Sequence, residues 1–101
     1  MVAKEDYIAV FASGVGGISV LRHLVDVLPG ERFLYFGDSA NAPYGSRSTE
    51  EVRQLTLDGA AYLLDNYPLK ALVIACNTAT AAAVRQVREK YPDLIVIGIE
   101  P

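Results

Sequence analysis

The stretch that decides the fold is Ala71-Leu-Val-Ile-Ala-Cys-Asn-Thr-Ala-Thr80. An apolar run rich in β-branched residues stops at the only cysteine of the chain, and amide and hydroxyl side chains then open an alanine-rich segment. This pattern predicts a buried strand over 71–75 and a helix over 78–90. Cys76 would then lie at the carboxyl end of a strand, where open α/β sheets bind ligands, and at a helix N-terminus, which favours a reactive thiolate. The alternative is a buried structural cysteine that acts as a small hydrophobic residue.

The segments on either side repeat this alternation of strand and helix. Apolar runs predict three more strands, at 7–11, 32–37 and 94–99, and two more helices, at 18–28 and 48–66. The second of these helices begins with Ser48-Thr-Glu-Glu51, a capping-box pattern. Continuous apolar strands joined by helices indicate the α/β class: a four-stranded parallel sheet of order 2-1-3-4, with right-handed crossovers and helices on both faces.

The spacing of apolar residues predicts which side of each helix faces the sheet. The expected inward residues are Ile18, Leu21, Leu24, Val25 and Leu28 in the first helix, Val52, Leu55, Gly59 and Leu63 in the second, and Val84, Val87 and Tyr91 in the third. His23 falls outside the first apolar stripe, so we expect it on the solvated surface rather than in a catalytic role.

Length, charge and cysteine content limit the partners of the chain. With 101 residues, 51% of them hydrophobic, it forms at most one domain with a small core. A net charge of −3 without a basic run argues against nucleic acid and anionic membranes as partners. One cysteine cannot form an internal disulfide, and no stretch resembles a signal or membrane-spanning segment, so we expect a cytoplasmic protein.

Three loops should converge at the carboxyl edge of the predicted sheet: 12–17, 38–45 and 76–80. The first supplies glycine N–H groups at a helix N-terminus, where anions bind. The second is long for a strand-to-helix connection, which favours a functional loop, and it carries Tyr44. The third carries a thiol flanked by Asn77, Thr78 and Thr80. Together the three loops suit a small ligand that bears a carboxylate.

Each of these features also has a purely structural explanation. The glycines could serve only a tight turn, Tyr44 could cap the core with its hydroxyl in water, and Asn77 could cap the helix that follows it. Asp38 could do no more than form an ion pair with Arg47. The functional interpretation depends on all three loops lying at one edge.

Four stretches are specific enough to compare with known families: Val10-Phe-Ala-Ser-Gly-Val-Gly-Gly17, Gly37-Asp-Ser-Ala-Asn-Ala-Pro-Tyr-Gly-Ser-Arg47, Val73-Ile-Ala-Cys-Asn-Thr-Ala-Thr-Ala81 and Ile97-Gly-Ile-Glu-Pro101. At these residues, which span nearly the whole chain, it resembles the glutamate racemases of the cofactor-independent aspartate/glutamate racemase superfamily. The resemblance implies two similar α/β domains that face each other across the substrate. It also implies one cysteine from each domain, with neither pyridoxal phosphate nor a metal.

The resemblance further implies roles for individual residues. Cys76 corresponds to the catalytic cysteine of the N-terminal domain, and the residues that hold the carboxylate and ammonium groups of the amino acid are Ser13, Tyr44, Gly45, Asn77 and Thr78. The substrate would be glutamate, and the product D-glutamate for peptidoglycan. Inversion needs two cysteines because a single monoprotic group returns its proton to the face from which it came. One thiolate removes the α-proton while the opposite thiol delivers another.

The chain departs from the family pattern in two respects. Ala12 replaces the aspartate of the Asp-Ser-Gly-Val-Gly-Gly motif, a carboxylate that assists proton transfer or holds the substrate ammonium in the family. Residues 1–101 correspond to the N-terminal half, and the second domain with its own cysteine is absent. We therefore expect this chain not to racemise glutamate by itself. Two copies that face each other as a symmetric homodimer could still bring both Cys76 thiols to one substrate.

Two other functions remain open. Gly14-x-Gly16 after the first strand, with Asp38 after the second, loosely resembles a dinucleotide-binding fingerprint, although Ser19 occupies the third glycine position. That function would be a nucleotide-binding module. The chain could also be a non-catalytic fragment or a self-associating scaffold, which Ala12 and the missing second half both favour.

Overall fold

The structure, a computed structural model, describes residues 6–99 apart from the side chain of Val15. Glu100-Pro101, the end of the fourth family-like stretch, lies outside the described residues, as do residues 1–5. The strands are β1 (Tyr7–Ala12), β2 (Arg32–Gly37), β3 (Leu69–Ile74) and β4 (Ile95–Gly98). The helices are α1 (Ile18–Val27), α2 (Thr49–Asn66) and α3 (Asn77–Lys90), with short 3-10 turns η1 (Val15–Gly17), η2 (Ser39–Asn41) and η3 (Tyr44–Ser46).

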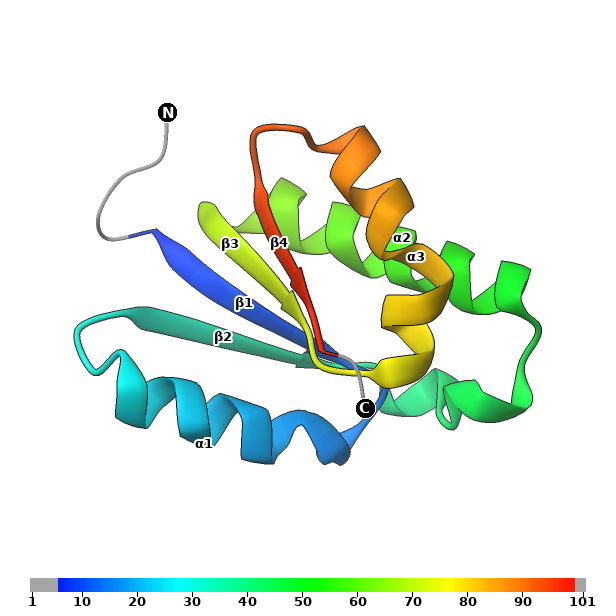
Figure 1. Cartoon of the computed structure of the whole chain (residues 1–101), viewed down its shortest axis with the longest axis horizontal. Helices are drawn as coiled ribbons and strands as arrows, with labels where there is room; N and C mark the ends of the chain where they lie inside the picture. The colour runs from blue at the N-terminus through cyan, green and yellow to red at the C-terminus, as the bar shows by residue number, and fades with distance from the viewer. Residues whose placement is uncertain (1–5, 100–101) are drawn as a thin grey trace.

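The four strands form one parallel sheet in the order β2-β1-β3-β4, which confirms the predicted topology. Figure 1 shows α1 against one face of this sheet and α2 and α3 against the other. The register pairs Ala12 at the end of β1 with Gly37 of β2, and Phe11 with Ile74 of β3. The central strand β1 therefore ends between the carboxyl ends of its two neighbours.

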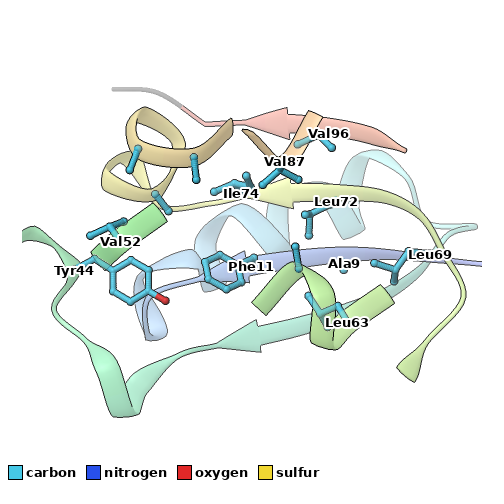
Figure 2. Close-up of a cluster of buried hydrophobic side chains, with 14 residues drawn as sticks. Ala9, Phe11, Tyr44, Val52, Leu63, Leu69, Leu72, Ile74, Val87 and Val96 are labelled. Atoms are coloured by element: carbon cyan, nitrogen blue, oxygen red, sulfur yellow. The ribbon is translucent and has the colours of Figure 1, made fainter. Parts of the chain in front are cut away.

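Side chains of β1 alternate between two hydrophobic layers. Phe11 lies on the α2–α3 side, in the larger cluster shown in Figure 2, together with Ala9, Tyr44, Val52, Leu63, Leu72, Ile74 and Val87. Val10 lies on the α1 side, with Ile8, Ala71 and Val73. This alternation follows from the two-residue period of a strand, and the two layers shield β1 from water.

Helix α2 begins as the capping-box pattern predicts. The Glu51 N–H donates to the Ser48 hydroxyl over 3.1 Å, and the Ser48 N–H donates to Glu51 Oε1 over 3.3 Å. Val52, Gly59 and Leu63 are buried as predicted. Leu55 is half-buried and packs against the larger cluster, as do Val84 and Tyr91 of the α3 segment, while Val87 is fully buried.

The prediction for α1 was wrong at three positions. Leu21 and Leu24 pack against the sheet, but Ile18, Val25 and Leu28 are 41%, 44% and 40% exposed. Val20 takes an inward position instead. The buried stripe is narrower than the apolar pattern because α1 is the one helix on its face within residues 6–99, so its flanks have no neighbouring helix to pack against.

This face of the sheet also leaves β4 partly open. Ile95 and Ile97 are 61% and 47% exposed, and an apolar hollow of about 320 Å³ lies between α1 and Ile97. His23 is exposed, as expected, and lines the same hollow. An edge strand with exposed isoleucines is typical of a surface that another polypeptide covers.

The ends of most elements, β2 excepted, differ from the predictions by one or two residues. β3 begins at Leu69 rather than at residue 71, and β4 covers Ile95–Gly98 rather than 94–99. α3 begins at Asn77, one residue early, which makes Cys76 its N-cap. The last shift matters for the site, because it places the thiol directly at the helix N-terminus.

Candidate active site

Backbone hydrogen bonds bring the three predicted loops together at the carboxyl edge of the sheet. Asp38 N donates to Ala12 O over 2.9 Å, which joins the tyrosine loop (residues 37–47) to the glycine turn (residues 12–17). Ala75 N donates to Phe11 O over 2.7 Å, which brings the thiol segment (residues 76–80) to the same strand end. The structure confirms the predicted convergence.

The glycine turn packs closely against both neighbouring strands. The Tyr35 hydroxyl of β2 donates a hydrogen bond to Gly14 O. A Cβ at position 17 would lie 2.7 Å from Ala12 Cβ and 3.3 Å from Ala75 Cβ, so only glycine allows this approach. Packing therefore accounts for Gly17, while Ser13 on the same turn remains partly accessible.

The tyrosine loop is organised around Asp38. Its Oδ2 accepts a hydrogen bond of 2.6 Å from the Tyr44 hydroxyl, and Asn41 Nδ2 donates to both carboxylate oxygens over 3.0 and 3.1 Å. Arg47 Nε donates to Asn41 O over 2.8 Å, and its guanidinium forms an ion pair of 3.3 Å with Glu51. Arg47 thus forms its ion pair with Glu51 and not with Asp38. The structural alternative, in which Asp38 serves only as the ion-pair partner of Arg47, was therefore wrong. The loop contains a cis Ala42–Pro43 peptide bond.

Tyr44 belongs to the core and not to the solvated rim. It is 1% exposed, and its ring lies beside Phe11 with the centroids 6.3 Å apart (Figure 2). Burial raises the pKa of Tyr44 well above its usual range, with further contributions from the hydrogen bond and charge of Asp38 and from charge at Cys76, against the opposing charge of Arg47. The hydroxyl therefore binds Asp38 rather than water, and Tyr44 lies within electrostatic reach of the thiol.

Cys76 occupies the N-cap of α3 with φ −132° and ψ 119°. Its side chain is partly buried and packs against the larger hydrophobic cluster, while its carbonyl accepts a hydrogen bond of 2.9 Å from Thr80 N. Cys76 is therefore partly rather than fully buried, and its role, structural or catalytic, stays a prediction. The thiol lies at the helix N-terminus and at the edge where the glycine turn and the tyrosine loop meet.

The polar residues after Cys76 divide into two groups. Asn77 is exposed and Thr78 is partly buried in the first turn of α3. Asn77 already belongs to the helix, so the idea that it caps α3 was wrong. Thr80 is buried, donates to Ile74 O over 3.3 Å and packs beneath Gly98 of β4. Thr80 is a core residue, whereas Asn77 and Thr78 remain at least partly accessible in the first turn of α3.

Two small residues complete the edge. Gly45 is exposed in η3, and a Cβ there would have no neighbour within 4 Å. Ala12 is 1% exposed, and its Cβ faces Gly17 on the α1 side of the sheet. Gly17 therefore lies close to both Ala12 and Ala75, the residue before Cys76.

Two residues of this edge have roles that the sequence analysis missed. Tyr35 holds the glycine turn, and Asp38 holds Tyr44. Alternation along β2 places Tyr35 with Phe33 on the α1 side, a signal that was available in the sequence. No comparable signal pointed to Asp38, because its partners at positions 41 and 44 depend on the turns of a long loop.

Among the side chains of residues 6–99, no group of three or more His, Cys, Asp or Glu is arranged to hold a metal ion. No helix in that part of the chain combines the length and apolar character needed to cross a membrane.

Comparison with known sequences gives closely similar proteins that share one name. Glutamate racemase of Clostridium acetobutylicum is 56% identical over 101 residues, which covers 100% of this chain and 39% of that protein. Glutamate racemase of Clostridium novyi is 55% identical over 94 residues, 93% of this chain and 36% of that protein. A scan against protein-family models gives no match.

Solved structures agree with these relatives. Glutamate racemase isoform RacE1 of Bacillus anthracis superposes with a TM-score of 0.90 at 43% identity, covering 95% of this chain and 35% of that chain. The Escherichia coli glutamate racemase, in complex with L-glutamate and the activator UDP-MurNAc-ala, gives 0.90 at 34% identity, covering 94% and 35%. These solved proteins, which share the fold of this chain, are amino-acid racemases. Along its whole length the chain is homologous to glutamate racemase, and it spans little more than a third of the length of those enzymes.

Proposed function

We propose that this chain forms one wall of a cofactor-independent glutamate-racemising site, with Cys76 as one of its two proton carriers. The observation that carries the proposal is the position of Cys76 at the N-terminus of α3, on the edge where the glycine turn and the tyrosine loop are hydrogen-bonded together. The homologous Escherichia coli structure is described with L-glutamate and the Francisella tularensis structure with D-glutamate, which supports glutamate as the ligand.

The chemistry follows from the residues at this edge. The N-terminus of α3 favours negative charge on the Cys76 thiolate, which would remove or return the α-proton on one face of the substrate. Asn77 and Thr78 in the first turn, with Ser13 and Gly45 across the edge, would bind the carboxylate and ammonium groups. Fixed donors of this kind stabilise the negative charge that develops when the α-proton leaves.

We further propose that residues 1–101 are one α/β half of a two-domain racemase. The relatives are nearly three times as long as the stretch they share with this chain, and a second thiol would come from the remainder. The exposed isoleucines of β4 and the apolar hollow beside α1 support a face that further polypeptide covers. An enzyme of this kind would work in the cytoplasm and supply D-glutamate for peptidoglycan.

A homodimer is a second way to complete the site. Two copies could cover the β4 face of each other and present a Cys76 from each to one substrate. The same exposed residues, Ile95 and Ile97, favour this association in the isolated chain. Sedimentation that shows a strict monomer at high protein concentration would exclude it.

The proposal is tested with the isolated chain and L-glutamate. We expect no D-glutamate to form, because one of two thiols and the carboxylate at position 12 are missing. We do expect glutamate to shift the amide NMR signals of Asn77 and Thr78, and NAD or ATP to leave them in place. Signals that respond to a nucleotide and not to glutamate would favour the nucleotide-binding alternative instead.

A further inference from the structure

Asp38 connects the glycine turn to the buried Tyr44: its backbone N–H donates to Ala12 O, and its carboxylate accepts from the Tyr44 hydroxyl. We infer that Asp38 is a positioning residue of the candidate active site, which fixes Tyr44 within the hydrophobic cluster against which Cys76 packs. Its relevance to catalysis rests on the proposed function, but the contacts themselves are independent of it. Asp38 does not need to touch a substrate for this role, because it acts through Tyr44.

The side chain and the backbone of Asp38 are each held by a hydrogen-bond partner. Asn41 Nδ2 reaches both of its oxygens, and the backbone N–H of Asp38 donates to Ala12 O over 2.9 Å. Arg47 in turn holds the carbonyl of Asn41 over 2.8 Å. A carboxylate with these restraints has a defined position relative to the end of β1, so it can transmit that position to a partner.

Tyr44 is the partner that depends on it. The ring is 1% exposed and lies against Phe11, so its hydroxyl needs a hydrogen-bond acceptor inside the protein. Asp38 Oδ2 provides that acceptor at 2.6 Å. Without the carboxylate, a buried donor would be left unpaired, and we expect the ring to move toward water rather than keep that position.

A movement of the Tyr44 ring would change the surroundings of the Cys76 thiol. Tyr44 is a buried member of the larger hydrophobic cluster, and Cys76 packs against the same cluster. Asp38 and Asn41 also line a hollow of about 410 Å³, together with Asp58 and Tyr62 of α2. Water in that hollow can solvate the Asp38 carboxylate while Tyr44 stays buried. Asp38 therefore lies between a solvated hollow and the hydrophobic cluster on which Cys76 packs.

The experiment follows the ring of Tyr44 by 13C NMR in a tyrosine-labelled chain. The chain has six tyrosines, and Tyr44→Phe identifies the relevant signal. Iodoacetamide then caps Cys76, the single cysteine, with a neutral group. In the unmodified sequence we expect capping to shift the Tyr44 signal. In Asp38→Ala we expect the signal to move toward that of an exposed tyrosine and its response to capping to be lost.

Two further variants keep the test decisive. Asp38→Asn retains an acceptor oxygen, so we expect a reduced response in a folded chain, and this variant decides the matter if Asp38→Ala unfolds. Glu51→Gln disturbs the nearby capping box without touching Asp38. In this variant the Tyr44 signal should still shift when Cys76 is capped. The inference is overturned if the Tyr44 signal and its response to capping are the same in both Asp38 variants as in the unmodified chain, or are lost equally in Glu51→Gln.

A titration with L-glutamate separates this inference from the proposed function. If glutamate shifts no signal of the unmodified chain, the glutamate site loses its support here. The response of Tyr44 to Cys76 capping still decides the role of Asp38 in that case, because it involves no substrate.

Discussion

The ring of Phe11 in β1 packs directly on the backbone of Gly59 in α2. A Cβ at position 59 would lie 3.1 Å from Phe11 Cδ2 and closer still to Cε2. The same ring stacks on Phe36 with the centroids 5.5 Å apart and borders Tyr44. The helix that supports the tyrosine loop can therefore approach the sheet only where it has no side chain.

We expect Gly59→Ala to destabilise the chain. Alanine improves helix propensity by about 1 kcal/mol, but overpacking against a fixed aromatic ring costs about 1–3 kcal/mol, so the clash should prevail. Urea unfolding followed by circular dichroism measures the difference. Gly30→Ala is the matched control, because a Cβ there would have no neighbour within 4 Å. Equal stability of the two variants would show that the contact is not tight in solution.

Tyr44 should make the stability of the chain fall at alkaline pH. Its pKa is raised in the folded state, so the folded chain keeps a proton that the unfolded chain releases above the ordinary value of about 10. The contribution of Tyr44 is therefore fully present below that pH and is lost as pH rises further, at up to about 1.4 kcal/mol per pH unit. The free energy of unfolding is measured with urea from about 1 pH unit below that value to about 2 units above it. It should fall more steeply with pH for the unmodified chain than for Tyr44→Phe. Parallel curves would contradict the buried hydroxyl.

The capping box at the start of α2 should contribute measurably to stability. Ser48→Ala removes the hydroxyl that accepts from Glu51 N and should cost about 1 kcal/mol. Hydrogen bonds from Ser48 lower the pKa of Glu51, so this acid stabilises the fold above its ordinary pKa and the contribution is lost as pH falls. The difference in stability between the unmodified chain and Glu51→Gln should accordingly shrink on acidification. A difference that is the same at pH 7 and at about pH 3 would contradict the capping box as drawn.

The topology of the sheet and the meeting of three loops at one edge could be predicted from the sequence, because strand length, helix periodicity and crossover handedness are local or general rules. The inward face of α1 could not. Ile18 and Val25 look like core residues in an apolar pattern, and a pattern cannot show that residues 6–99 place no second helix beside α1. The bond between Asp38 and Tyr44 was equally out of reach, since it depends on how η2 and η3 fold the intervening loop.

The exposed face of β4 should cause the isolated chain to self-associate. Ile97→Lys places a charge on an edge strand that is 47% exposed there, so the fold should tolerate it. Loss of one isoleucine from an interface is worth about 1.5–3 kcal/mol, which weakens association about tenfold or more. Sedimentation velocity over a concentration series measures the effect. Ala81→Lys is the control, because it adds the same charge at an exposed position of α3. If both variants associate equally, the interface lies elsewhere.

We have proposed that Cys76 is one of the two proton carriers of a glutamate racemase. The most direct measurement is D-glutamate formation by a chimera in which residues 1–101 with Ala12→Asp replace the matching part of the Clostridium acetobutylicum enzyme. We predict racemisation that Cys76→Ala abolishes and that falls about 10²–10⁴-fold when position 12 reverts to alanine. An unchanged turnover number on that reversion would reject the role of position 12 alone. A folded chimera that racemises glutamate equally well without the thiol at position 76 would contradict the account.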